Sequence, residues 1–229
     1  MAKRPVFIAE QTYPFVHEQL VDFEFYSGFA ISRAQKSIRS LHDAFKISHS
    51  QCEILEVSSK STELLGNRLS AFNLPYHLER GDCRPLESVF QSSKVFADGE
   101  QFADLLDASP QDAKKDSRLR EHGSIIGFKL EGNEFSNEPA TFFYDWIYCN
   151  AVYQNRELSQ AIRQYDAFTD IAFNPQKSLN CQARSAARFV GLSKAGLLKT
   201  VLSSKEDFLR IVYHSNDTHC VSYQLRMEF

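Results

Sequence analysis

The spacing of apolar residues in the first quarter of the chain predicts two strands, a helix and a third strand. Residues 5–8 and 20–31 are predicted as strands, because the stretch VDFEFY alternates apolar and polar side chains as a half-buried strand does. Residues 33–46 are predicted as a helix, and residues 52–60 as a short strand. The inner face of the helix contains the apolar residues Ile38, Leu41 and Phe45. Its other side is basic, with Arg33, Lys36 and Arg39.

Two further helices are predicted in the middle of the chain. Residues 84–94 read RPLESVFQSSK, and Pro85 suits the first helical turn because its missing N–H is not needed there. The next helix begins at Ser109, which is placed as the cap, with Pro110 at the first helical position. That helix carries the densest basic run of the chain, with Lys114, Lys115, Arg118 and Arg120.

The second half of the chain is predicted to be mostly helical. A strand is expected at 123–132, and the helix at 138–155 is apolar nearly all round, which indicates a central position. Residues 166–182 are predicted as a polar connection, and residues 183–202 as a helix. The connection is anchored by the apolar residues Phe168, Ile171 and Phe173.

A last helix is predicted to start at Ser203, where Glu206 is placed for a capping box. The final fifteen residues look loosely organised, and the chain shows neither an internal repeat nor a linker. We therefore predict one α+β domain that is mainly helical and has a small β-sheet.

The helix at 84–94 looks buried, yet it carries three polar groups on one side. Glu87, Gln91 and Lys94 recur at i, i+4 and i+7, which places them on one face of an α-helix. Burying an unpaired charge is costly, so proteins keep such groups where they pair or where they line a site. The row is either a Glu–Lys pair that holds the helix to a neighbour or part of a functional site.

The charge of the chain limits how it can bind nucleic acid. A formal net charge of −3 argues against non-specific coating of DNA, so any contact must come from a local patch. The candidate patches are the basic groups at 33–39, 114–120 and 184–199, and an ordinary solvated face is the alternative for the first. Nineteen Phe and nine Tyr form either a Phe-rich core or stacking surfaces for bases.

Cysteine usage and hydropathy indicate a cytoplasmic protein. The five cysteines include no CxxC pair, so neither a disulfide framework nor a zinc site is predicted, and reduced thiols fit a cytosol. No segment is long and apolar enough for a signal peptide or a membrane span. No cofactor and no metal are expected, since the polar tail suits a surface better than a metal site despite His214, Asp217, His219 and Cys220.

The stretch LSAF at 69–72 and the sequence E-x-x-F-Q-x-x-K at 87–94 resemble two motifs of the NADAR superfamily. In that family an L-S-N-F element leads through a hairpin to a helix reading P-x-S-E-H-x-F-Q-x-x-K-F. Here Ala71 replaces the Asn, and Ser88 stands where the family usually has His.

Weaker matches extend the resemblance over roughly residues 55–195. ASPQDAKKDSR at 108–118 resembles the family's s-P-x-x-A-x-x-x-g-R helix. KSLNCQARSAARF at 177–189 resembles its G-x-N-x-L-G-x-x-L-M element, with Asn180 in the Asn position, although the Trp-Gly pair that precedes this element in the family is missing.

Blocks such as KSIRSLH, ILEVSSKS and YDAFTDI are similar to the NADAR antitoxins encoded beside DarT-type toxins. Those toxins attach ADP-ribose from NAD to guanine bases of DNA. The resemblance implies an N-glycosidase that releases ADP-ribose from modified DNA and restores guanine, with a cognate DarT-type toxin as a further partner. It also implies one NADAR-like domain over residues 1–229, with a catalytic core at 55–195, N-terminal strands and a helix at 1–50, and a C-terminal helix and tail at 196–229.

This chemistry suggests roles for the polar row. Breaking the bond requires charge stabilisation at the ribose and a proton for the leaving base. Glu87 is the candidate acid or base, because a poorly solvated carboxyl can serve near neutral pH. Lys94 either attacks the opened sugar to form a Schiff base, or orients Glu87 and holds a ribose hydroxyl. Gln91 either binds a ribose hydroxyl or supports packing, and Asp170 and Asp166 are secondary acid or base candidates.

The other candidates would bind the substrate. Phe72 and Phe90 suit stacking on adenine or guanine, although core packing is the simpler role for Phe90. Asn180 is either a plain helix cap or the start of a helix whose free N–H groups meet a pyrophosphate, with Arg184 adding a bidentate contact. Three more substrate-binding candidates, with a surface role as the alternative for the two cations, are Ser70, Lys60 and Arg68.

Two other functions fit the sequence. An N-glycosidase acting on a phosphorylated, riboflavin-pathway-like metabolite would have a closed, strongly basic pocket and no DNA-facing basic surface. A non-catalytic module that binds ADP-ribose or DNA would protect its target without chemistry, so Glu87→Ala would leave that protection intact.

Overall fold

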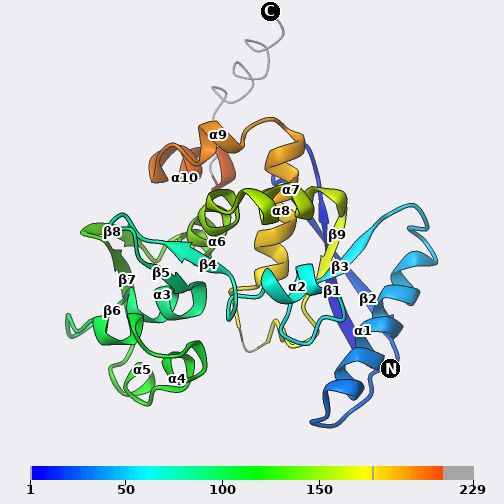
Figure 1. Cartoon of the computed structure of the whole chain (residues 1–229), viewed down its shortest axis with the longest axis horizontal. Helices are drawn as coiled ribbons and strands as arrows, with labels where there is room; N and C mark the ends of the chain where they lie inside the picture. Colours follow the sequence, from blue (N-terminus) through cyan, green and yellow to red (C-terminus); the bar gives the residue numbers. More distant parts are fainter. Residues whose placement is uncertain (1, 177, 214–229) are drawn as a thin grey trace, which may run out of the picture.

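The computed structural model describes residues 2–176 and 178–213 of the 229-residue chain. A four-stranded sheet with the order β2-β1-β9-β3 lies at one side of the molecule (Figure 1). Strand β1 pairs antiparallel with β2 and with β9, whereas β3 runs parallel to β9. The bounds of these strands are Ala2–Ala9 for β1, Val16–Phe23 for β2, Ile54–Glu56 for β3 and Ala167–Thr169 for β9.

The strand predicted at 20–31 is wrong from residue 24 onward, and the observed strand begins earlier, at Val16. Strand β2 ends at Phe23 because the partner of Phe23 is Ala2, where β1 begins. Beyond that point no neighbouring strand offers hydrogen bonds, and residues 24–30 form a loop in which Gly28 has a φ of +134°. The strand at 5–8 is confirmed and is longer than predicted.

Helix α1 (Ile31–Lys46) covers one face of this sheet, as the amphipathic pattern predicts. Its inner residues Leu41 and Phe45 pack with Val6 of β1 in a buried cluster. Phe7, the next residue along β1, points to the other face and joins the main core, to which helix α8 (Gln182–Lys194) contributes. The N-terminal strands are therefore shared between two layers of side chains.

A hairpin and a second sheet form the other side of the molecule. Strands β4 (Pro75–His77) and β5 (Cys83–Pro85) make the hairpin that the family resemblance implies, and helix α3 (Leu86–Ser92) follows at once. Pro85 precedes this helix as its N-cap instead of lying in its first turn. The predicted helix at 84–94 is too long, because residues from Lys94 onward pair as a strand in the sheet β6-β7-β8. The bounds of this sheet are Lys94–Phe96 for β6, Ile125–Leu130 for β7 and Asn133–Ser136 for β8.

Short helices surround these strands. Ser109 caps helix α4 (Pro110–Lys115) as predicted, since its hydroxyl accepts a hydrogen bond from the backbone N–H of Asp112. The predicted basic helix is divided, however, because the extended backbone of Asp116 ends α4 before α5 (Arg118–Glu121) begins. The other short helices of this half are α2 (Leu64–Arg68) and η1 (Ala103–Leu106).

Helix α6 (Phe142–Gln154) is the central helix, and most of its residues are buried, as its apolar sequence predicts. The helix predicted at 183–202 is two helices, because Gly196 adopts a φ of +71° between α8 and α9 (Leu198–Val201). The last described helix starts one residue later than predicted, and Ser204, not Ser203, accepts from the backbone N–H of Asp207. The remaining bounds are Arg156–Ala161 for α7, Ile162–Gln164 for η2 and Lys205–Tyr213 for α10.

The predicted polar connection at 166–182 contains the largest difference from the sequence-based fold. Its residues Ala167–Thr169 form β9, which lies between β1 and β3 inside the sheet. The anchors Phe168, Ile171 and Phe173 are buried, as predicted. Residues from the expected N-terminal segment and from the expected core thus form one sheet, and the α+β class is confirmed.

Two expectations concern other parts of the chain. Within the described ranges, no helix combines the length and the apolar composition needed to cross a bilayer. The loosely organised tail, with its group of His, Asp and Cys residues, lies outside the residues that the structure describes.

Candidate functional site

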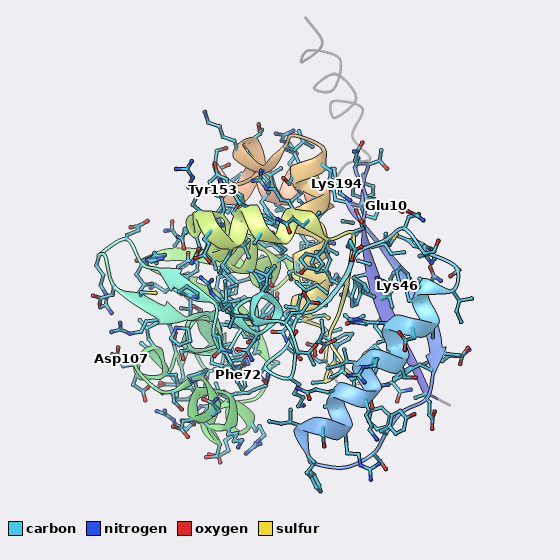
Figure 2. All side chains as sticks on the ribbon, turned by 45° about the vertical axis from the view of Figure 1, so that its right-hand side comes forward. Glu10, Lys46, Phe72, Asp107, Tyr153 and Lys194 are labelled. Carbon is cyan, nitrogen blue, oxygen red and sulfur yellow. The ribbon has the colours of Figure 1, made fainter. Side chains whose placement is uncertain are left out.

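The candidate site is a cleft with two adjoining pockets of about 450 and about 530 Å³. Five residues line both pockets and therefore mark their junction: Glu87, Lys114, Tyr144, Ser178 and Asn180. Loops after β3, α2 and β9 build the first pocket, which contains Phe72, labelled near the centre of Figure 2. Helix α3, the start of β6, strand β7 and the start of α6 build the second.

The predicted polar row exists as a chain of hydrogen bonds that begins at this junction with Glu87 and continues along the second pocket with Gln91 and Lys94. The Gln91 amide donates from Nε2 to Glu87 Oε1 over 2.7 Å, and Lys94 Nζ donates to Gln91 Oε1 over 2.6 Å. Glu87 and Gln91 are 4% and 6% exposed, although both line the cleft. Lys94 is the first residue of β6, which follows the helix closely. Its side chain therefore still joins the predicted row, although it belongs to a strand and not to the helix. The acid, the amide and the amine hold one another in fixed orientations.

Lys94 lies in an environment that disfavours its positive charge. Its ammonium group stands 5.0 Å from the centre of the Phe90 ring, and burial lowers its pKa to about 8, with the charge of Lys114 adding to the effect and Glu87 opposing it. A lysine with this pKa supplies far more neutral amine near pH 7 than an exposed lysine does. The neutral form is the nucleophilic one.

Lys114 belongs to the junction, a position that the sequence did not reveal. Its Nζ lies 3.5 Å from Glu87 Oε1 and 5.1 Å from the centre of the Phe72 ring. Sequence reasoning placed this residue only in a basic run for DNA contact. One sign of this position is the apolar Ala113, which is the buried residue of α4. Lys114 follows it directly and therefore lies at the edge of the face that points inward.

Two further acids, Asp170 and Glu56, lie at the first pocket and behind its lining. Asp170 lines that pocket and accepts hydrogen bonds from Gln182 Nε2 at 2.9 Å and from the Ala172 backbone N–H at 3.0 Å. Behind it, the buried Glu56 accepts from Thr169 Oγ1 at 2.6 Å and from the Ile171 N–H at 2.9 Å. Burial raises the pKa of both carboxyls, that of Glu56 to about 7 with help from the charge of Asp170. Sequence reasoning missed Glu56 because it interpreted this residue only as part of a short strand.

One side chain of helix α1, that of His42, is connected to the hydrogen bonds around Glu56. The Thr169 hydroxyl donates to Glu56, so it accepts from Nε2 of His42 at 2.8 Å. Burial lowers the pKa of His42 to about 4, which keeps this imidazole neutral. The strand ends that carry the acids are thus connected to the N-terminal layer.

Several other predicted residues also line the cleft. Lys60, Ser70 and Phe72 lie in the first pocket, and Phe90 lies in the second. Ser70 is 2% exposed and donates to the backbone carbonyl of Asn67 at 2.7 Å, so it also fastens its own loop. Phe90 packs edge-to-face with Tyr144 at 5.1 Å, which fits the core-packing role considered for it.

Asn180 and Tyr144 line both pockets. The Asn180 side-chain oxygen is buried and has no hydrogen-bond partner within the described part of the chain. Burial raises the pKa of Tyr144 well above its usual value, so its phenol stays protonated and available as a donor. Tyr144 was missed because an aromatic residue in an apolar helix gives no sign of a site.

Three predicted residues are not at the cleft. Arg68 forms an ion pair with Glu157 at 2.6 Å, and Asp166 is bonded to Lys194 at 2.7 Å. Arg184 lies over the ring of Phe7 and pairs with Glu18 at 3.3 Å, so it offers no bidentate contact to a pyrophosphate. Each of these groups is engaged by a residue far away in the sequence.

Among the described residues no group of three or more His, Cys, Asp or Glu side chains is arranged to hold a metal ion. The cleft instead combines carboxyls, lysines and aromatic rings around a narrow junction. Such an arrangement can bind an extended polar ligand and deliver a proton or an amine at the point where the pockets meet.

Comparison with known proteins adds the family. No curated protein matches the chain. One family model does match, that of the DarT1-associated NADAR antitoxins, over residues 2–220, and it confirms the predicted resemblance. With nearly its whole length matched, and with the polar row of its E-x-x-F-Q-x-x-K motif lining the cleft, the chain belongs to the family of DarT1-associated NADAR antitoxins.

Proposed function

We propose that this antitoxin is an ADP-ribosyl hydrolase that cleaves the N-glycosidic bond between ADP-ribose and a guanine base of DNA. The observation that carries the proposal is the hydrogen-bonded row Glu87–Gln91–Lys94, in which Glu87 lies at the junction of the two pockets and Gln91 and Lys94 line the second. Membership of an antitoxin family associated with a DarT1 toxin supports the proposed biological role, which is to remove the modification that the toxin makes.

The geometry supports different chemical roles for Glu87 and Lys94. Glu87 is poorly solvated, accepts a hydrogen bond from Gln91 and forms an ion pair with Lys114, so it is placed to pass a proton to the departing base nitrogen. The bond from that nitrogen to C1′ breaks, and a water molecule adds its hydroxyl to C1′. Free ADP-ribose and an unmodified guanine are the products.

A covalent route uses Lys94 in addition. Its neutral amine adds to C1′ of the ring-opened sugar and displaces the base nitrogen, which takes up a proton from Glu87. The resulting Schiff base is then hydrolysed by water, which releases ADP-ribose and restores the amine. The lowered pKa of Lys94 supports this route. In the alternative route Lys94 stays protonated and only holds the ribose or Glu87.

The test is release of ADP-ribose from an oligonucleotide that carries ADP-ribosylated guanine, followed by chromatography. Borohydride added during turnover distinguishes the two routes, because reduction of a Schiff base leaves a stable adduct on Lys94 that mass spectrometry detects. Turnover without any adduct at Lys94 would favour the non-covalent route. Binding of the modified strand without release of the sugar would identify a non-catalytic binder.

The cleft gives less support to the alternative function, an N-glycosidase that acts on a phosphorylated metabolite. Its lining contains three lysines, Lys60, Lys94 and Lys114, but also the carboxyls of Glu87 and Asp170, so it is not strongly basic. Hydrolysis of a phosphorylated riboflavin-pathway intermediate in preference to the modified oligonucleotide would nevertheless overturn the proposal.

A further inference from the structure

The loop at 24–30 and the start of α1 expose an unusual group of apolar side chains. The relative exposures are 46% for Phe25, 110% for Phe29 and 60% for Ile31. Single exposed apolar residues are ordinary, but three within seven positions form a patch. Gly28, with its φ of +134°, sets the turn that carries Phe29 outward.

Three cations stand directly beside this patch. Arg33, Lys36 and Arg39 are exposed, and within the described residues none of them has an ion-pair partner. Residues 25–42 contain no Asp or Glu, and the first turn of α1 has no acidic residue. Arg33 lies in the first turn of α1, where a cation opposes the helix dipole, so this residue does not stabilise its own helix.

The loop that carries Phe29 lies at the lower edge of the view in Figure 1, and α4 and α5 lie in the lower part of the same view. In Figure 1 the loop before α1 and the pair α4–α5 stand on opposite sides of the segments that line the first pocket. In Figure 2 Lys46 marks the far end of α1, and the near end reaches the lower part of the view, as Phe72 does. Lys115 and Arg120 on the α4–α5 side are exposed as well.

We infer that Phe29, Arg33, Lys36 and Arg39 form a contact surface for the nucleic-acid strand that carries the modified base. The inference rests on the proposed function. From Arg33 to Arg39 the helix rises about 9 Å, which matches roughly three nucleotides of a stacked strand at about 3.4 Å each. The cations contact phosphates, and Phe29 stacks on a base that has lost its neighbour. A chain with a net charge of −3 gathers three cations without ion-pair partners among the described residues here, beside exposed apolar side chains.

The test measures binding of a fluorescein-labelled, unmodified single strand of about 20 nucleotides by anisotropy over a range of NaCl concentrations. The variant Arg33→Ser/Lys36→Ser/Arg39→Ser should bind about tenfold or more weakly at low salt. Its log–log salt slope should be smaller by about two, since each phosphate contact on a single strand contributes about 0.7. Phe29→Ser should weaken binding roughly five- to a hundredfold with the salt slope unchanged, as expected for one stacked base.

Two matched controls remove the same charge and the same kind of exposed apolar surface elsewhere. Lys129→Ser/Arg156→Ser/Arg163→Ser changes three exposed cations on other elements, and Ile47→Ser changes an 86% exposed residue at the far end of α1. Both should bind like the wild type. Equal weakening by both triple variants, or no binding by the wild type, would overturn the inference.

Other partners give distinct results. Binding of the wild type, but not of Phe29→Ser, to anionic lipid vesicles, with no effect of either variant on the oligonucleotide, would identify a membrane surface instead. Failure of the proposed function is separate: a wild type that binds the strand through this surface but releases no ADP-ribose refutes the hydrolase proposal and leaves the surface intact. An effect of the triple variant on release from a modified mononucleoside would contradict a strand-contacting role.

Discussion

The role of Lys94 depends on whether its amine carries a proton, and its neighbours influence the pKa of that amine. The positive charge of Lys114 contributes to the lowered pKa of Lys94, whereas the negative charge of Glu87 raises it. If the neutral amine attacks the sugar, kcat/KM should rise with pH through about 8. If the ammonium form only holds the substrate, activity should instead fall over the same range.

Lys114→Met removes one of the two charges and should shift this limb of the pH profile to higher pH, because the ammonium form of Lys94 loses an unfavourable neighbour. The measurement is kcat/KM from pH 6 to 10 on the modified oligonucleotide. Lys115→Met, at the next exposed position of α4, is the control and should leave the limb in place. A limb that stays where it is in Lys114→Met would contradict this electrostatic account.

Glu56 should make the stability of the protein depend on pH. Its folded-state pKa of about 7 lies above the ordinary value of 4.5, so the folded state binds more protons between these two values. The free energy of unfolding should therefore fall as pH rises from about 4.5 to 7, by about 1.4 kcal/mol per pKa unit of difference. Denaturant unfolding at pH 5, 6 and 7 should show a flatter dependence for Glu56→Gln. Glu53→Gln, which changes an exposed acid nearby, should keep the wild-type slope.

At the scale of elements, helix α2 holds the loop with Ser70 and Phe72 against the end of β3. A Cβ atom at Gly66 would lie 1.9 Å from the carbonyl oxygen of Glu56 and 2.5 Å from Ser61 Oγ. Gly66→Ala should therefore push α2 away from β3 and destabilise the fold by about 1–3 kcal/mol or more. The measurement is the shift in denaturation midpoint against Leu64→Ala, which changes a 75% exposed side chain of the same helix. Equal midpoints for the two variants would show that this close approach is not required.

Some secondary-structure elements could be predicted from the sequence, and others could not. Helices α1 and α6 follow from patterns within one segment, and Ser109 with Pro110 marks a helix start by local chemistry. Strand β9 is three residues long and has polar neighbours, so no period identifies it, and only pairing with β1 and β3 makes it a strand.

The same limit applies to the candidate site. Glu87, Gln91 and Lys94 were found because their spacing is local and their neighbours match a motif, even though Lys94 belongs to a strand. Lys114 and Glu56 depend on contacts with residues far away in the chain, as do the ion pairs that keep Arg68 and Arg184 away from the cleft. Spacing alone contains no information about such contacts.

At the scale of the whole molecule, the N-terminal strands are part of the core and not an addition to it. Val6 and Phe7 of β1 are fully buried, and β1 lies between β2 and β9. A fragment containing only residues 55–195 would expose the apolar faces that β1 and α1 cover, so it should not fold alone. Circular dichroism melts and proton NMR dispersion of the fragment, compared with the full chain, are the measurement. A cooperative melt of the fragment would show that the core at 55–195 is autonomous.

The central claim is that a row of three polar side chains lining the cleft breaks an N-glycosidic bond. The most direct measurement is the rate of ADP-ribose release from an oligonucleotide carrying ADP-ribosylated guanine, for the wild type, Glu87→Gln, Lys94→Met and Ser88→Ala. Ser88 lies on α3 beside Glu87 but bonds to the carbonyl of Ala108, so its variant is the matched control. We expect release by the wild type and by Ser88→Ala, and losses of about 100-fold or more for Glu87→Gln and Lys94→Met. Release at the wild-type rate by Glu87→Gln and Lys94→Met, or no release by the wild type itself, would contradict the account.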